Sequence, residues 1–245
     1  MTRILAIDTA GPVLGLALIH DGELQHTSDN SGPLRHVEQI VPRIDEALSY
    51  AGWNIRDLTA VAISAGPGSF TGLRVGMSAA KALALSGGIP VISIDTLMAL
   101  AATERYRRGA EPDPERPTVI VPVLDARKSR FYAAAFRNTA ELARLAEDGD
   151  LTWEELELMM RSVLPGDDSR WCAPGSMTEL FQEYRGYVAA AAHKVSAAPG
   201  AALLGYRRLG TGAADSAYQG PFYLRSGDVG RGSSIPRFKP AQESD

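Results

Sequence analysis

The stretch SAGPGSFTGLRVG, residues Ser64–Gly76, has the composition of a phosphate-binding loop that leads into a helix. Its glycines allow close backbone approach, and the N–H groups at a helix start attract an anion. Hydroxyl groups and an arginine in the same stretch can bind phosphate oxygens. An acid ends the first predicted strand, a threonine follows it, and both can face the same ligand. The candidate nucleotide- or phosphate-contacting residues are therefore Asp8, Thr9, Gly68, Ser69, Phe70, Thr71 and Arg74.

The established phosphate-binding patterns do not fit this stretch. A P-loop needs a second glycine followed by lysine, but Thr71 stands at that glycine's position and the next lysine is Lys81. The dinucleotide pattern GxGxxG fails at the same residue. A second interpretation therefore stays open, in which the glycines shape a tight strand-to-helix connection and the hydroxyls cap the helix.

Two helical patterns suggest packing surfaces. Very small residues recur every four positions after the loop, which favours close approach to another element, either the chain's own sheet or a partner helix. An amphipathic helix precedes the loop, and Pro42 either opens or kinks it. We expect a partner interface at Val37, Ile40, Val41, Ile44, Leu48, Gly72, Gly76, Ala80 and Ala84.

Other catalytic chemistry has little support. The four histidines have no metal-binding spacing, and the single cysteine, Cys172, excludes an intramolecular disulfide, so we expect no metal. No G-x-S-x-G elbow supports a serine hydrolase. Asp8 and Asp125 each end a buried strand, where acids hold a metal or water in some proteins and form turns in many others.

The elements that would position these residues alternate between apolar strands and helices. Strands are predicted at Ile4–Asp8, Thr59–Ser64 and Pro90–Ile94, and Asp21-Gly22 predicts a hairpin turn. A helix follows the loop as far as Gly87-Gly88, and another begins at Asp95 or Thr96.

The second half of the chain repeats part of this pattern. A strand ending in Asp125 lies 117 residues after the one ending in Asp8, and both lead through a turn into another apolar strand. Such units are common in α/β proteins, so the repeat alone does not establish a duplication. Residues 138–170 and 187–204 are predicted to be helical, and the final stretch is predicted to be an extended or disordered tail.

Composition limits the class of protein. The chain has 245 residues, a net charge of -4 and a pI of about 5.6, which argues against non-specific binding to nucleic acid. No apolar run approaches the ~20 residues of a membrane span. Together with the single cysteine, this predicts a soluble cytoplasmic protein.

The ordered set ILAIDTA, GPGSFTGLRVG, PVISIDTLMALA, LDARKSRFYAA and PFYLRSGDV closely resembles the TsaB/YeaZ family. The family is the bacterial accessory subunit of the tRNA threonylcarbamoyladenosine synthase. The resemblance runs from about residue 3 to 228 and is poor over 138–200. It implies an α/β, actin-like and hexokinase-like (ASKHA, ribonuclease H-like) fold with two duplicated lobes. The expected divisions are an N-terminal lobe, 1–108, a linker, 109–117, a C-terminal lobe, 118–225, and a tail, 226–245.

The resemblance also implies a function. The family's catalytic paralogue carries two metal-binding histidines after the third strand, and Thr96 and Leu100 stand at those positions here. The chain therefore looks like the non-catalytic member, which activates the paralogue in modifying adenosine 37 of tRNAs that read codons beginning with A. The implied partners are the catalytic paralogue (TsaD family), a P-loop ATPase (TsaE family), tRNA indirectly, and a second copy when the chain is alone. No membrane partner is implied, and no cofactor is required, although ATP or ADP could bind at a subunit junction.

Two other hypotheses stay open. The first is an autonomous ATPase or sugar-kinase-like phosphotransferase of the same fold, in which Asp8 and the Gly68–Thr71 loop would hold Mg-ATP. The second, a metallopeptidase, is weaker because the histidine pair is missing.

Overall fold

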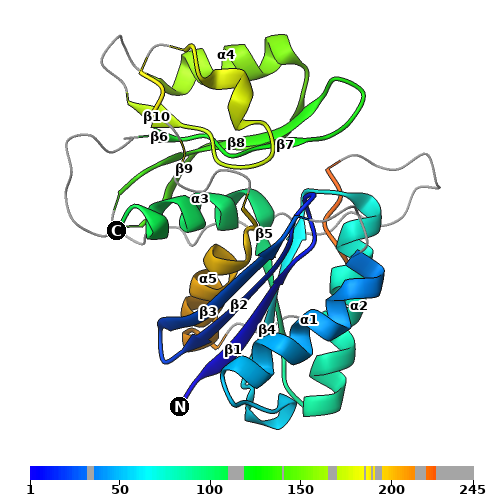
Figure 1. Ribbon diagram of the computed structural model, residues 1–245. Coiled ribbons are helices and arrows are strands. Elements are labelled where there is room, and N and C mark those ends of the chain that lie inside the picture. Colours follow the sequence, from blue (N-terminus) through cyan, green and yellow to red (C-terminus); the bar gives the residue numbers. More distant parts are fainter. Residues whose placement is uncertain are drawn as a thin grey trace.

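The computed structural model describes residues 1–31, 36–109, 119–139, 141–164, 170–184, 186–188, 190, 195–212 and 219–224. These residues form two sheets with helices on their faces (Figure 1). Apart from Gly109, the predicted linker lies outside the described residues, as does the whole predicted tail. No helix among the described residues is long and apolar enough to cross a membrane.

The first sheet has the strand order β3-β2-β1-β4-β5. Its strands are β1 (Arg3–Asp8), β2 (Leu14–His20), β3 (Glu23–Asn30), β4 (Ala60–Gly66) and β5 (Val91–Asp95). β1, β4 and β5 are parallel, while β2 and β3 are antiparallel to their neighbours. The predicted hairpin is confirmed, since Asp21 and Gly22 both have positive φ between β2 and β3. β1 is apolar on both faces because both faces are covered, which explains its unbroken apolar run.

The second sheet repeats the arrangement of β3-β2-β1-β4. Its strands are β6 (Val119–Ile120), β7 (Val123–Asp125), β8 (Phe131–Arg137), β9 (Ala143–Leu151) and β10 (Trp171–Cys172). β6 and β7 both pair with β8, and β9 and β10 flank them. β6 and β7 thus correspond to β1 divided by a break at 121–122. This topology bears out the weak internal repeat as a duplication of the fold.

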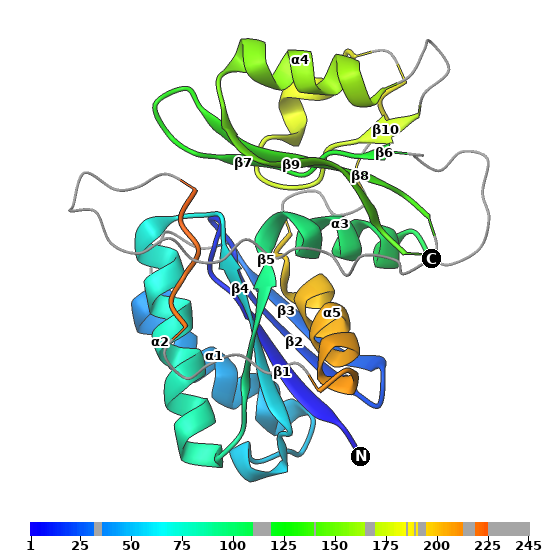
Figure 2. The same ribbon diagram turned by 180° about the vertical axis from the view of Figure 1, so that it is seen from behind.

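The helices form layers around and between the sheets. They are α1 (His36–Tyr50), α2 (Phe70–Gly87), α3 (Thr96–Arg107), α4 (Trp153–Val163) and α5 (Ala198–Gly210), with short 3-10 helices η1 (Ile55–Asp57) and η2 (Thr178–Phe181). α1 and α2 cover one face of the first sheet, while α5 covers the other, and α3 lies between the two sheets (Figures 1 and 2). α4 and η2 cover the outer face of the second sheet.

Two helix predictions are wrong in part. Residues 143–151 form β9, although Ala, Leu and Glu favour a helix there, because pairing with β8 extends the second sheet. The helix predicted over 187–204 starts only at Ala198, where Pro199 fits the first turn, and runs to Gly210. α5 falls within the range assigned to the C-terminal lobe, yet it packs against the first sheet. The division at 109–117 stays a prediction.

Candidate functional site

The glycine-rich loop packs against the end of β1. A Cβ atom on Gly68 would lie 2.6 Å from the carbonyl oxygen of Ala10, and one on Gly72 would lie 2.1 Å from that of Thr9. The N–H of Ser69 donates to Ala10 O at 2.7 Å, and the Ser69 hydroxyl caps α2 by accepting from Gly72 N at 3.3 Å. The glycines therefore allow one part of the chain to approach another, which supports the strand-to-helix interpretation of the motif.

Asp8, the acid that could have faced a nucleotide, is buried, and both of its oxygens accept backbone hydrogen bonds. Oδ1 accepts from Ala10 N at 3.0 Å and Oδ2 accepts from Ala197 N at 2.6 Å. Burial raises the pKa of Asp8, and the hydrogen bonds from Ala197 and Ala10 oppose this rise. The carboxylate is thus directed at the chain's own backbone.

The bonds of Asp8 belong to a set that caps α5 from outside the helix. The N-cap, Ala197, has no side-chain cap, so the N–H groups at the start of α5 find other acceptors. Ser196 N donates to Asp29 Oδ1 at 3.3 Å, and Gly200 N donates to Thr103 Oγ1 at 2.9 Å. Residues of β1, β3 and α3 together therefore hold the first turn of α5.

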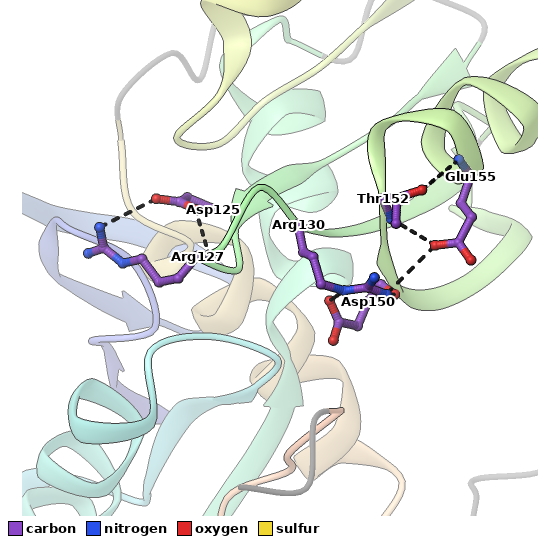
Figure 3. Close-up of polar contacts among 6 residues, drawn as sticks. All are labelled: Asp125, Arg127, Arg130, Asp150, Thr152 and Glu155. Atoms are coloured by element: carbon purple, nitrogen blue, oxygen red, sulfur yellow. Dashed lines mark hydrogen bonds and ion pairs between the residues drawn. The ribbon is translucent and has the colours of Figure 1, made fainter. Parts of the chain in front are cut away.

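Asp125, the counterpart of Asp8 in the second sheet, forms a turn. Its Oδ1 accepts from Arg127 N at 2.7 Å, and its Oδ2 lies 3.5 Å from the Arg127 guanidinium (Figure 3). At the other end of the same turn, Arg130 pairs with Asp150 at 2.9 Å. The turn interpretation of Asp125 is the one that these contacts support.

A cleft of about 200 Å3 lies between the two sheets. Its lining includes Asp8 at the end of β1, Val13 just before β2, Thr96 at the start of α3, Leu124 of β7 and Ser176 after β10. Pockets that bury a drug-sized ligand measure about 300–1,000 Å3. In this conformation the cleft is therefore small for a nucleotide.

The structure divides the seven candidate contacts into two groups. Asp8 and Thr9 are buried, and the Thr9 hydroxyl donates to Gly72 O at 2.8 Å. Ser69, Phe70, Thr71 and Arg74 are exposed at the start of α2, and Gly68 between the two groups is half-buried. The Arg74 guanidinium lies 4.4 Å from the Phe70 ring centroid. Of the seven residues, Asp8 lines the cleft between the sheets, whereas the exposed group lies at the surface.

A family model described as TsaD, tRNA N6-adenosine threonylcarbamoyltransferase, matches residues 33–160, more than half of the chain. The tRNA threonylcarbamoyladenosine biosynthesis protein TsaB of Escherichia coli is 33% identical over 65% of this chain, and that of Haemophilus influenzae is 36% identical over 53%. The chain belongs to the TsaB/YeaZ family. The matched regions span 62% and 51% of those two relatives.

The solved structures extend the similarity to most of the fold. YeaZ from Pseudomonas aeruginosa superposes with a TM-score of 0.74 at 23% identity, covering 91% of this chain and all of that one. At this identity the match shows the fold alone. It confirms the actin-like, two-sheet architecture expected from the sequence.

Part of the interface predicted for this TsaB/YeaZ family member is wrong. The stripe Gly72, Gly76, Ala80 and Ala84 is buried, and a Cβ on Gly76 would lie 2.2 Å from Thr9 Oγ1. The small residues allow α2 to approach the chain's own sheet, so they cannot also face a partner.

The amphipathic helix α1 shows the same division. Ile40, Ile44 and Leu48 pack into the core with the first sheet. Val37 and Val41 are 66% and 61% exposed. Of the nine predicted interface residues, these two are therefore the ones available to a partner.

Exposed apolar residues of α2 away from the buried stripe were not among the predicted interface residues. Leu85 is 87% exposed, and Phe70, predicted as a phosphate contact, is 47% exposed. The helical period contained the signal for Leu85, since the face opposite a buried stripe of small residues must be solvent-exposed.

Two buried residues stand at the positions where the catalytic paralogue carries metal-binding histidines. Thr96 and Leu100 are buried, and Thr96 Oγ1 accepts from Gly66 N at 3.1 Å. Among the described residues, no group of three or more His, Cys, Asp or Glu side chains is placed to hold a metal ion.

Proposed function

We propose that this chain is a non-catalytic accessory subunit for tRNA threonylcarbamoyladenosine formation. It activates a catalytic paralogue of the TsaD family, which modifies adenosine 37 of tRNAs that read codons beginning with A. Membership of the TsaB/YeaZ family supports the pathway. The observation that carries the accessory role is an apolar surface, which we call the α1–α2 face, formed by exposed Val37, Val41, Phe70 and Leu85.

The α1–α2 face has the properties of a protein-docking surface. α1 and α2 lie side by side on one face of the first sheet (Figure 1), so the exposed side chains of the α1–α2 face lie on two neighbouring helices. Val37 and Val41 are one helical turn apart and lie on the same side of α1. Large apolar side chains gathered on one exposed face mark interaction sites in soluble proteins.

The interior of the chain gives little support to the alternative, an autonomous ATPase or phosphotransferase. Such an enzyme needs a carboxylate free to face metal-bound nucleotide, whereas both Asp8 oxygens accept backbone hydrogen bonds. The cleft beside Asp8 has a volume of about 200 Å3, below the range of ligand pockets. We propose that the chain needs no cofactor and that any ATP or ADP binds at the junction with its partner.

The proposal includes the other partners implied by the family. A P-loop ATPase of the TsaE family joins the complex, tRNA is contacted indirectly, and the α1–α2 face pairs with a second copy when the paralogue is absent. Size-exclusion chromatography tests this pairing. We expect the chain alone to elute as a homodimer, and the chain mixed with the paralogue to elute as a heterodimer.

The function is tested by reconstitution. The chain, the catalytic paralogue and the P-loop ATPase are purified separately and mixed with unmodified tRNA, ATP and an activated threonylcarbamoyl donor. We expect threonylcarbamoyladenosine only when this chain is present, together with co-purification of chain and paralogue. Equal amounts of product without this chain would refute the accessory role. ATP turnover by the isolated chain would favour the alternative, an autonomous ATPase or phosphotransferase.

A further inference from the structure

Three ionisable side chains connect the two sheets of the molecule. Arg144 of β9 in the second sheet places Nη2 2.7 Å from Asp95 Oδ2, at the end of β5 in the first sheet. The same guanidinium pairs through Nη1 with Asp148 of β9. Asp95 also caps α3, because its Oδ1 accepts from Met98 N at 2.8 Å. The cluster thus ties β9 to the start of α3, the helix that lies between the sheets (Figure 2).

The irregular pairing of β9 brings Arg144 and Asp148 to this point. Ala133 of β8 pairs with Gly149, but Ala135 pairs with Ala146, so β9 contains one extra residue there, and a second irregularity follows before Phe136. Bulges bend a strand and redirect its side chains. The Arg144 guanidinium lies 4.7 Å from the Phe136 ring centroid, which holds it toward the first sheet.

The charges of the cluster do not balance unless one acid keeps a proton. Two carboxyl groups and one guanidinium meet where the Asp148 side chain is only 9% exposed. Burial, followed by the charge of Asp95 and a hydrogen bond with it, raises the pKa of Asp148 to about 8, and Arg144 opposes this rise. A carboxyl–carboxylate hydrogen bond requires a shared proton.

Other charged groups nearby do not supply the missing positive charge. Arg208 of α5 donates to the carbonyl oxygen of Ser93 on β5 at 2.6 Å. Arg130, at the turn before β8, pairs with Asp150 of β9. Glu147, another acid of β9, is exposed. The proton balance of the cluster therefore rests on Asp95, Arg144 and Asp148.

We propose that Asp95, Arg144 and Asp148 form a proton-dependent latch that holds β9 of the second sheet against the start of α3. The protonated latch is neutral and closed. Loss of the proton leaves a net negative charge in a largely buried place, where the two carboxylates repel each other. Because Thr96 beside the latch and Leu124 of the second sheet both line the cleft, opening the latch widens the cleft.

Hydrogen exchange on the full chain, measured between pH 5 and pH 9.5 and corrected for the intrinsic exchange rate, tests the latch. In the wild type we expect amides of the first turn of α3 and of β9 to lose protection as the pH rises to about 8, and protection to level off above that pH. Below about pH 8, the proton released on opening increases the open population about tenfold per pH unit. This measurement uses the chain alone, so it is independent of the proposed function.

Three variants make the test decisive. Asp148→Asn is neutral at every pH, and Asp95→Asn keeps a capping side chain while removing one of the two acids, so both should abolish the pH dependence. Glu147→Gln removes an exposed acid of the same strand and should behave as the wild type. A wild-type chain without pH dependence, or Asp148→Asn and Asp95→Asn chains that retain it, would overturn the latch. Circular dichroism at pH 6.5 verifies that each variant is folded.

Discussion

The carboxylate of Asp8 accepts a 2.6 Å hydrogen bond from the backbone N–H of Ala197, 189 positions later in the chain. The bond joins the end of β1 to the residue before α5, so the first predicted strand holds the last described helix in place. Asp8 therefore has a structural role in this chain. The same contact explains why α5 packs on the first sheet although it follows the second in sequence.

Replacement of Asp8 by alanine should destabilise the fold. It leaves the buried N–H groups of Ala10 and Ala197 without acceptors, at a cost of about 2–4 kcal/mol for two charge-assisted bonds. Urea unfolding followed by circular dichroism measures the loss. The control is Asp125→Ala, which removes an acid from an exposed turn and should cost less than about 1 kcal/mol. If the Asp8→Ala variant were as stable as the wild type, the capping role of Asp8 would be contradicted.

Gly76→Ala should destabilise the protein although alanine favours a helix. The added Cβ would lie 2.2 Å from Thr9 Oγ1 and 3.0 Å from Ile63 Cδ1, so α2 must move away from the sheet. Such overpacking costs about 1–3 kcal/mol. A contact as short as 2.2 Å belongs to the upper part of that range, above the helix-propensity gain of about 1 kcal/mol. Gly210→Ala in α5 is the matched control, because nothing lies within 4 Å of its new Cβ. A lower Tm for the first variant and an unchanged or higher Tm for the second is the expected pair of results.

Val41→Glu should abolish binding to the catalytic paralogue and leave the fold intact. Val41 is 61% exposed on the α1–α2 face, so a charge there costs little in the monomer but is buried without a partner in a complex. Titration calorimetry measures the affinity, and we expect a loss of at least about tenfold. Leu158→Glu on α4, at a residue that is 70% exposed, is the control and should bind normally. Full affinity of the Val41 variant would place the interface elsewhere.

Much of the fold could be predicted because the signals are local. The apolar run of β1, the Asp21-Gly22 turn and the capping serine of α2 all specify structure within a few residues. β9 could not be predicted in this way, because its strand conformation comes from pairing with β8 and its sequence favours a helix.

The candidate site was harder to predict because its residues have local signals for two incompatible roles. Asp8 fits both a ligand contact and a buried strand end, and Gly76 fits both a partner interface and close packing on the chain's own sheet. The choice depends on contacts with Thr9 and Ala197, which are distant in the sequence. The Asp95–Arg144 pair shows the same limit, since 49 residues separate two groups that meet only when both sheets are formed.

The stability of the chain should carry a pH dependence that belongs to Asp148. Its pKa is about 8 in the folded protein and close to 3.8 when unfolded, so the folded state binds the extra proton between these values. The stability that this group contributes is therefore fully present below about pH 4 and is lost as the pH rises to about 8. One proton corresponds to about 1.4 kcal/mol per pH unit within that window. Asp148→Asn should remove this slope. Unfolding curves of the wild type and the variant at pH 5, 6, 7 and 8 give the difference in their free energies of unfolding at each pH. If the free energies of unfolding of the wild type and the variant changed with pH in parallel, Asp148 would be ionised in the folded chain. The two profiles diverge only if the folded wild type holds a proton that the unfolded chain has lost.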